Sequence, residues 1–310
     1  MTTLLQLLVA GVSLGAVYAL LALGFVVVFK ATGVVNFAHP ALLMAGAYVT
    51  ARLGGPGGLP IGDPDSADPL RFALGLLIGV ASASALALVV QRGLVHPMAA
   101  RSVVAVSILT IGVDVVVQTE VVRRFGATEA LPMGDPWGAD VARAFGVTVP
   151  HTRLAALVVG LVVIAAFFAW FRLSTWGVAM RAVAEDPETA SLMGIRRSRV
   201  AAIAWVLAGG LAAIAGLFVS VSPAAGLTPA TTVVALHAFP AAIIGGLDST
   251  GGAVVGGLVV GVAEMLTQGY AADLAFLGRG FHSVMPYVVM VAVLLIRPAG
   301  LFGTGEVHRV

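Results

Sequence analysis

A few polar and ionisable side chains stand inside long apolar stretches of this chain. Asn36 and His39 lie in GVVNFAHPALLMAGAYV, Asp114 lies in TIGVDVVVQ, and His237 lies in ALHAFPAAI. An amide, a carboxylate and an imidazole can bind a polar solute, and histidine can also exchange a proton near neutral pH. Burying such a group unpaired in hydrocarbon costs on the order of several kcal/mol. Each must therefore pair inside a helical bundle or line a water-filled path.

Two interpretations stay open for each residue. Pro40 removes a helical hydrogen bond, so we expect 35–52 to be a broken helix in which the Asn36 amide donates to the freed carbonyl. Such a break lies beside a solute path in many transporters, but it is also compatible with a kink that touches no solute. Asp114 is either functional or paired with a neighbouring helix, and His237 is either a pathway residue or a hydrogen-bonded core residue. Glu264 is expected to anchor a helix end.

The elements that position these residues are apolar segments of membrane-spanning length. Hydrophobic residues make up 59% of the 310, charged residues make up 10%, and the mean hydropathy is +1.04. A helix of roughly 20 apolar residues spans a bilayer. The composition therefore predicts one all-α, polytopic membrane domain over 1–310, with about eight to ten membrane segments. The nine apolar segments are 4–29, 35–52, 70–90, 103–122, 154–171, 200–222, 229–247, 250–268 and 281–296.

Some of these segments are rich in glycine. The segments 35–52 and 229–247 are short, so we expect them to be broken or re-entrant. The run GGAVVGGLVVG at 251–261 has small residues at three-to-five spacing, which predicts close helix packing within the chain or against a second subunit.

Composition and motifs exclude several classes of function. The sequence has no cysteine, no phosphate loop of the form GxxxxGK[ST], and no polar region long enough for a soluble enzyme domain. We therefore expect no catalytic residue, no metal site and no cofactor bound by this chain, and any ATP must be hydrolysed by a partner chain. Arginines lie scattered at segment ends, which argues against nucleic-acid binding.

The longest polar interval on the expected cytoplasmic side is the polar loop, residues 172–199. Its sequence predicts a short helix in which Asp186 is the N-cap, Pro187 is the first helical residue, Glu188 lies in the first turn and Gly194 ends the helix. Such a helix either lies on the membrane interface or docks into a protein partner.

The positive charges predict an orientation. If the polar loop is cytoplasmic, ten of the 17 Lys and Arg residues are cytoplasmic and seven are outside. The positive-inside rule then places the N-terminus outside and the C-terminus in the cytoplasm.

Four stretches resemble a known family. They are NFAHPALLMAGAY, SILTIGVDVVVQ, GVAMRAVAEDPETASLMGI and GLTPATTVVALHAFPAAIIGGLDSTGGAVVGGLVVGVAE, in chain order. Together they resemble the permease subunits of bacterial high-affinity branched-chain amino acid ABC importers. The sequence departs from the family pattern at Pro40, Asp114, His237 and Asp248.

The resemblance implies a role for the polar loop. ETASLMG resembles the loop by which such permeases dock onto ATPase subunits; Glu188, Ala190 and Gly194 fit its pattern, and Thr189 replaces an alanine. The expected ATPase-coupling residues are Glu185, Asp186, Pro187, Glu188, Ala190 and Gly194, and the candidate pathway residues are Asn36, His39, Asp114 and His237.

The resemblance also implies partners and a place in the cell. It implies two ATP-binding subunits, a second permease subunit that is a different chain or a copy of this one, and a solute-binding protein. The complex would lie in the inner membrane of a bacterium and move a branched-chain amino acid or a related small polar solute inward. The alternatives are an ABC permease for urea or short amides, and a secondary transporter or channel that works without ATP.

Overall fold

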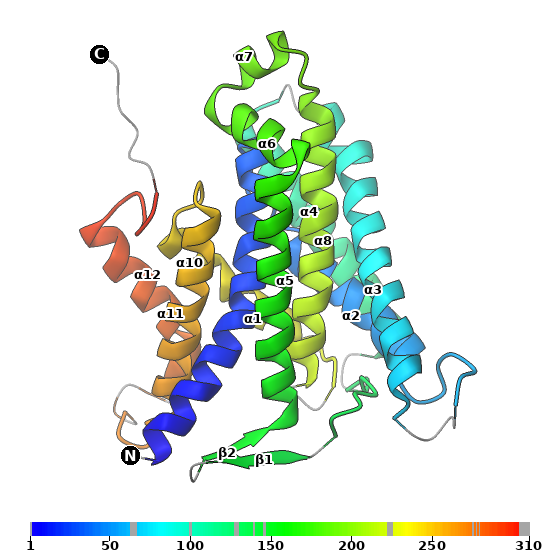
Figure 1. The fold of residues 1–310 in the computed structure, drawn as a ribbon, viewed down its shortest axis with the longest axis vertical. Coiled ribbons are helices and arrows are strands. Elements are labelled where there is room, and N and C mark those ends of the chain that lie inside the picture. Colours follow the sequence, from blue (N-terminus) through cyan, green and yellow to red (C-terminus); the bar gives the residue numbers. More distant parts are fainter. Residues whose placement is uncertain are drawn as a thin grey trace.

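The structure is a computed structural model of a helical bundle (Figure 1). It describes residues 2–62, 67–98, 101–126, 130–138, 140–144, 147–221, 226–274, 276, 278 and 280–303. Residue 222, at the end of a predicted segment, and Arg279 and Arg309, which entered the charge count, lie outside these ranges. The helices are α1 (Thr2–Thr32), α2 (His39–Gly54), α3 (Pro69–Val90), α4 (Val103–Phe125), α5 (His151–Leu173), α6 (Thr175–Glu185), α7 (Pro187–Leu192), α8 (Arg197–Val221), α9 (Thr231–Leu236), α10 (Ala238–Gly245), α11 (Thr250–Gly269) and α12 (Met285–Ile296).

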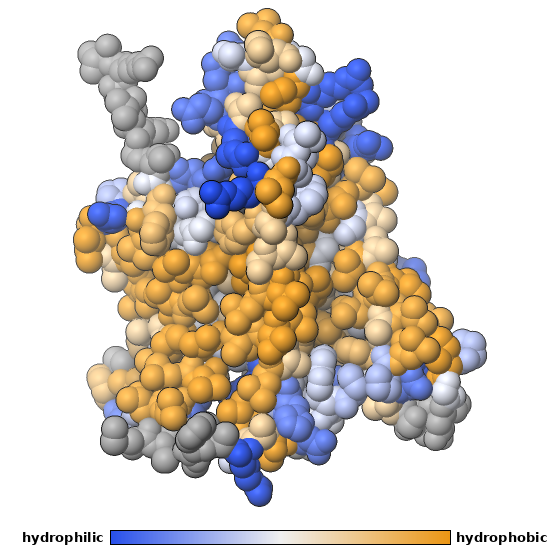
Figure 2. All heavy atoms as spheres, viewed as in Figure 1, coloured by the Kyte–Doolittle hydropathy of each residue, from blue (hydrophilic) through white to orange (hydrophobic). Residues whose placement is uncertain are grey.

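Helix α1 forms the centre of the bundle. It packs against α11, α8, α5 and α10, and 83% of its most apolar stretch is buried. For α4 the buried share is only 17%, so its apolar side chains face outward. Figure 2 shows a hydrophobic band across the middle of the molecule, with hydrophilic residues gathered at the end that carries α7. A surface this apolar is stable only against lipid.

The described residues contain six helices long and apolar enough to cross a membrane, namely α1, α3 with the turns that follow it, α4, α5, α8 and α11. The stretches 231–245 and 285–296 are shorter apolar helices. The predicted polytopic helical fold is therefore confirmed. A π-helical turn (Gln91–Val95) and a 3₁₀ turn (His96–Met98) extend α3, and another 3₁₀ turn (Phe281–Ser283) precedes α12.

The glycine run of α11 packs directly on the backbone of α1. A Cβ placed on Gly257 would lie 2.4 Å from the backbone nitrogen of Ala19, and one on Gly261 would lie 2.3 Å from that of Gly15. No side chain fits there, because backbone atoms cannot move aside. The predicted close packing is confirmed, and it takes place within this chain.

A small antiparallel hairpin was missing from the all-α prediction. Strand β1 (Val141–Ala144) pairs with β2 (Val147–Pro150), with Val141 opposite Pro150 and Ala144 opposite Val147. The Gln6 amide donates to the Thr148 carbonyl at 3.1 Å, so the hairpin lies beside the N-terminal end of α1. The polar loop lies at the opposite end of the bundle (Figure 1).

Both segments predicted to be broken are broken. Helix α2 begins only at His39, and the His39 ring lies against Gly24 of α1. At 1.5 Å per residue, Gly24 lies roughly 12 Å before Thr32, the last residue of α1. Residues 33–38 therefore return into the bundle without helical structure. In 229–247 the interruption is slight, because His237 alone separates α9 from α10 and keeps helical angles of φ −65° and ψ −20°.

Candidate functional site

The polar loop contains the predicted capped helix. Asp186 is the N-cap of α7, and its Oδ1 accepts hydrogen bonds from the backbone N–H groups of Glu188 at 2.9 Å and Thr189 at 3.1 Å. The Thr189 hydroxyl also donates to Asp186, and this bond, with the backbone bonds, holds the pKa of Asp186 below its ordinary value of 3.8. A lowered carboxyl pKa means that this cap stabilises α7 at neutral pH and is lost only as the pH falls through the lowered value.

Gly194 ends this helical segment in the left-handed conformation, with φ 84°. The Gly194 N–H donates to the Ser191 carbonyl and the Ile195 N–H to the Ala190 carbonyl, both at 3.0 Å. A glycine adopts this φ without strain, which explains its place in the motif.

The six predicted coupling residues differ in burial. Ala190 is buried and anchors α7 to the core, whereas Glu185, Asp186 and Glu188 are exposed. The apolar tip of the segment was not predicted from the sequence: Leu192 is 87% and Met193 is 79% exposed. The assignment of ATPase contact to the six residues stays a prediction.

The broken start of α2 differs from expectation in one respect. The Asn36 side chain does not donate to a freed carbonyl; its Oδ1 accepts from the Ala38 N–H at 3.0 Å, and the Asn36 carbonyl accepts from the His39 N–H at 3.4 Å. Pro40 occupies the first turn of α2 and not a helix interior. A proline there breaks no helical hydrogen bond, so the expected mechanism was wrong although the break is real.

Helix α4 supplies the acceptors that this broken segment needs. Thr110 accepts the Phe37 N–H at 3.0 Å, and Asp114 Oδ1 accepts the Ala41 N–H at 2.9 Å. Gln118 donates to Asp114 Oδ2 at 2.6 Å. Asp114 therefore sits against the N-terminus of α2, where the helix dipole favours a negative charge. Among the described residues Asp114 forms these hydrogen bonds and no ion pair.

Asn36 and His39 are completely buried in the chain. The His39 ring packs on Phe25 with centroids 4.5 Å apart, and neither ring nitrogen has a partner at hydrogen-bond geometry among the described residues, although the Leu21 backbone lies nearby. Whether Asn36, His39 or Asp114 meets a solute stays a prediction.

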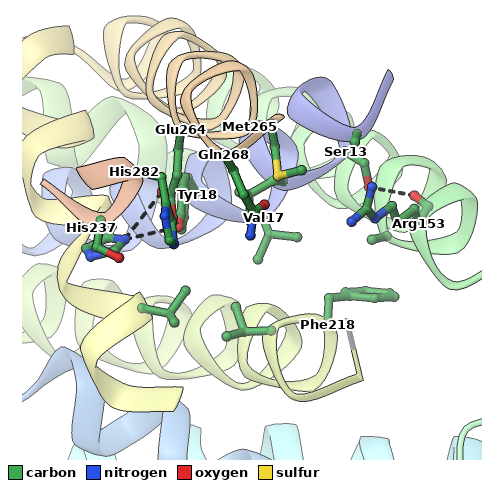
Figure 3. A pocket seen from close by; sticks show the side chains of 16 residues that line it. Ser13, Val17, Tyr18, Arg153, Phe218, His237, Glu264, Met265, Gln268 and His282 are labelled. Atoms are coloured by element: carbon green, nitrogen blue, oxygen red, sulfur yellow. Dashed lines mark hydrogen bonds and ion pairs between the residues drawn. The ribbon is translucent and has the colours of Figure 1, made fainter. Parts of the chain in front are cut away.

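His237 belongs to a buried cluster with Tyr18 of α1 and Glu264 of α11. The Tyr18 hydroxyl donates to Glu264 Oε2 at 2.8 Å, while His237 Nδ1 lies 3.3 Å from the same oxygen and 3.4 Å from the hydroxyl (Figure 3). Glu264 is thus part of an internal cluster, in which it contacts His237 at the junction of α9 and α10.

The cluster borders a cavity of about 160 Å³ between α1, α5, α8, α9 and α11. Arg153, near the start of α5, lies at the other end of the cavity in Figure 3, and Val17, Phe218 and Met265 line it between the two ends. Neither Tyr18 nor Arg153 was predicted from the sequence to be a site residue. A single window of sequence carries no signal for them, because their partners lie more than a hundred residues away.

The sequence of this chain is similar to one family of known membrane proteins. Residues 7–294 match the family described as "Branched-chain amino acid transport system / permease component". The high-affinity branched-chain amino acid transport system permease protein LivH of Salmonella typhimurium is 31% identical over 99% of this chain and 97% of its own length. BraD of Pseudomonas aeruginosa, a permease protein of the same description, is 30% identical over 99% of this chain and 98% of its own.

A more distant relative, the probable branched-chain amino acid transport permease protein LivH of Methanocaldococcus jannaschii, is 29% identical over 92% of this chain and 88% of its own length. No solved structure matches. A family match over almost the whole chain, in a bundle whose motifs take the predicted forms, leaves one conclusion: this chain belongs to the family of permease components of branched-chain amino acid transport systems.

Proposed function

We propose that this chain is the permease subunit of an ABC importer that moves a branched-chain amino acid, or a related small polar solute, into the cell. The observation that carries the proposal is α7, a capped helix that projects from the bundle and ends in two exposed apolar side chains. A soluble surface with no partner gains nothing from exposing Leu192 and Met193 side by side. A hydrophobic cleft on an ATPase subunit would bury both.

The complex then needs partners on both sides of the membrane. Two ATP-binding subunits grip this chain and a second permease subunit from the cytoplasm, because the sequence has no phosphate loop of its own. A solute-binding protein delivers the solute to the opposite face. This arrangement places the N-terminus outside and the C-terminus inside the inner membrane of a bacterium.

Movement of α7 can reach the core through rigid contacts. Ala190 anchors α7 to the core, and Trp176 of the adjoining α6 donates from its indole nitrogen to the Val200 carbonyl of α8 at 3.3 Å. Helix α8 packs on α1, α2 and α3. ATP-driven closure of the ATPases would therefore displace α6 and α8 together and shift the broken helix α2 beside them.

The double substitution Leu192→Ser with Met193→Ser tests this coupling. Neither side chain is buried in the chain, so the variant should insert and fold normally. It should bind the ATPase subunits at least roughly a hundredfold more weakly, because losing the burial of each apolar side chain costs about 1.5–3 kcal/mol and about 1.4 kcal/mol corresponds to a factor of ten. Co-purification of ATPase subunits with the tagged permease measures the loss.

The matched control is Leu173→Ser, because Leu173 is 85% exposed at the same end of the bundle but lies outside α7. It should leave co-purification unchanged. Normal ATPase binding by the double variant would contradict the proposal, as would concentrative uptake in cells that lack the ATPase genes.

A further inference from the structure

Another cavity, of about 330 Å³, lies at the end of the bundle that carries α7 (Figure 1). The end of α1, the π-helical turn that follows α3, and the first residues of α4 and α8 line it, and we call it the basic cavity. It contains none of the candidate pathway or coupling residues. Its volume is roughly that of eleven water molecules at about 30 Å³ each, so a phosphodiester with a small alcohol fits inside.

The charged side chains at the basic cavity all have one sign. Arg101 and Arg197 line it together with the imidazole of His96, and the described residues that line it include no Asp or Glu. Neither guanidinium forms a hydrogen bond or ion pair with a described residue. Two such guanidinium groups at one cavity attract an anion, and their N–H donors match the oxygens of a phosphate group.

Gln91 gives an independent sign of a ligand. It is the first residue of the π-helical turn after α3, it lines the basic cavity, and it is only 2% exposed. Its Oε1 has no hydrogen-bond partner among the described residues. A buried amide oxygen without a donor is destabilising, so a ligand hydroxyl that donates to Oε1 would be bound favourably. Turns of the π-helical type recur at functional sites.

The rest of the cavity wall is apolar and continues onto the outer surface of α4. Val95, Val103 and Val106 line the cavity, and Val103 and Val104 at the start of α4 are exposed. Helix α4 is the candidate membrane span with the smallest buried share among the described helices. A ligand with an anionic head and hydrocarbon chains would therefore contact the arginines with its head and α4 with its chains.

We propose that the basic cavity binds the headgroup of an anionic phospholipid that carries a free hydroxyl, such as phosphatidylglycerol. Arg101 and Arg197 hold the phosphodiester, Gln91 Oε1 accepts a hydrogen bond from the headgroup hydroxyl, and the acyl chains lie along α4. Basic pockets between membrane helices commonly take acidic headgroups. The placement of this lipid in the cytoplasmic leaflet rests on the proposed function, whereas the binding itself does not.

Native mass spectrometry of the chain in detergent, titrated with dioleoyl phosphatidylglycerol, tests the charge requirement. Arg101→Gln and Arg197→Gln should each weaken binding roughly tenfold to a hundredfold, the range expected for a lost hydrogen bond to a charged group. The matched controls, Arg92→Gln and Arg196→Gln, remove the same charge from exposed residues that do not line the cavity, and should leave binding unchanged. Equal losses in all variants, or equal binding of zwitterionic phosphatidylethanolamine, would overturn the site.

Gln91→Leu tests the hydroxyl. Phosphatidylmethanol has the same phosphodiester charge as phosphatidylglycerol but no headgroup hydroxyl, so the wild-type chain should bind it roughly twofold to tenfold more weakly, as expected for one lost hydrogen bond. Gln91→Leu should bind both lipids equally, at the affinity of the wild-type chain for phosphatidylmethanol. That retained affinity also shows that the variant is folded. A preserved preference for phosphatidylglycerol in Gln91→Leu would contradict the role of Oε1.

A soluble competitor identifies the source of the headgroup. Glycerophosphoglycerol is phosphatidylglycerol without its acyl chains, and an excess of it should not displace the lipid. Displacement would assign the cavity to a soluble phosphodiester, and release of the lipid when ATPase subunits bind would assign it to a protein interface; either result overturns the proposal. Lipid binding without co-purification of the ATPases would overturn the proposed function alone, and the converse result would overturn the lipid site alone.

Discussion

His39 illustrates how one polar residue restricts its neighbours. The ring is completely buried between Phe25 and the backbone of α1 at Gly24. A Cβ on Gly24 would lie 2.5 Å from Cε1 and 2.8 Å from Nε2 of the ring. The histidine, not an intrinsic backbone need, therefore explains why this helix has a glycine there.

Gly24→Ala should destabilise the protein by about 1–3 kcal/mol, because the buried imidazole has no room to move aside and overpacking strains its surroundings. Denaturant unfolding of the purified chain measures the change. Gly112→Ala on α4 is the matched control, since its Cβ meets nothing within 4 Å, and it should not destabilise. If His39→Ala fails to restore the stability of Gly24→Ala, the ring is not the cause.

At the scale of elements, the broken start of α2 depends on α4. Thr110 and Asp114 lie one turn apart on α4, and the N–H groups of Phe37 and Ala41 that they accept are also four residues apart. The two elements are thus matched in register. This bridging holds a non-helical stretch inside the bundle, where no water would satisfy its backbone.

Thr110→Val and Asp114→Leu should each cost roughly 1–3 kcal/mol of unfolding free energy, because each leaves one buried N–H without an acceptor. Thr110→Ser and Asp114→Asn keep an acceptor oxygen and are the matched controls, with smaller losses. Equal losses for Asp114→Leu and Asp114→Asn would show that charge, and not the hydrogen bond to Ala41, matters. Thermal unfolding in detergent gives the comparison.

At the scale of the whole molecule, the bundle has two chemically different ends. The polar loop, with its arginines and α7, occupies one end, and the hairpin of β1 and β2 with the N-terminus of α1 occupies the other. The proposed function requires the first end to be cytoplasmic.

Because the chain contains no cysteine, single cysteines can report this orientation directly. Arg196→Cys in the polar loop should react with a membrane-impermeant maleimide only after the cells are opened, whereas Arg143→Cys in β1 should react in intact cells whose outer layers admit the reagent. Both side chains are exposed in the fold, so a difference in labelling reports the side of the membrane and not burial within the protein. The reverse labelling pattern would contradict the orientation and the coupling role of α7.

Local features of this protein were determined by its sequence alone. The α7 cap joins Asp186 to groups two and three residues away, and the sequence predicted the interruption in 35–52, although not its mechanism. Apolar length likewise predicted the membrane helices, because the bilayer imposes the same requirement on any chain. The glycine run of α11 predicted close helix packing but did not identify the helix against which α11 packs.

The tertiary structure alone decided which distant residues meet. Tyr18 is 219 residues from His237 and 246 from Glu264, and Ser13 is 140 from Arg153. Periodicity tells which face of a helix is apolar but not which helix lies opposite, so the cavity and its two charged ends could not be read from any window of sequence. Asp114 is a further example. The sequence predicted an acid inside an apolar segment, but only the packing of α4 on α2 shows that Asp114 accepts a hydrogen bond from the start of α2.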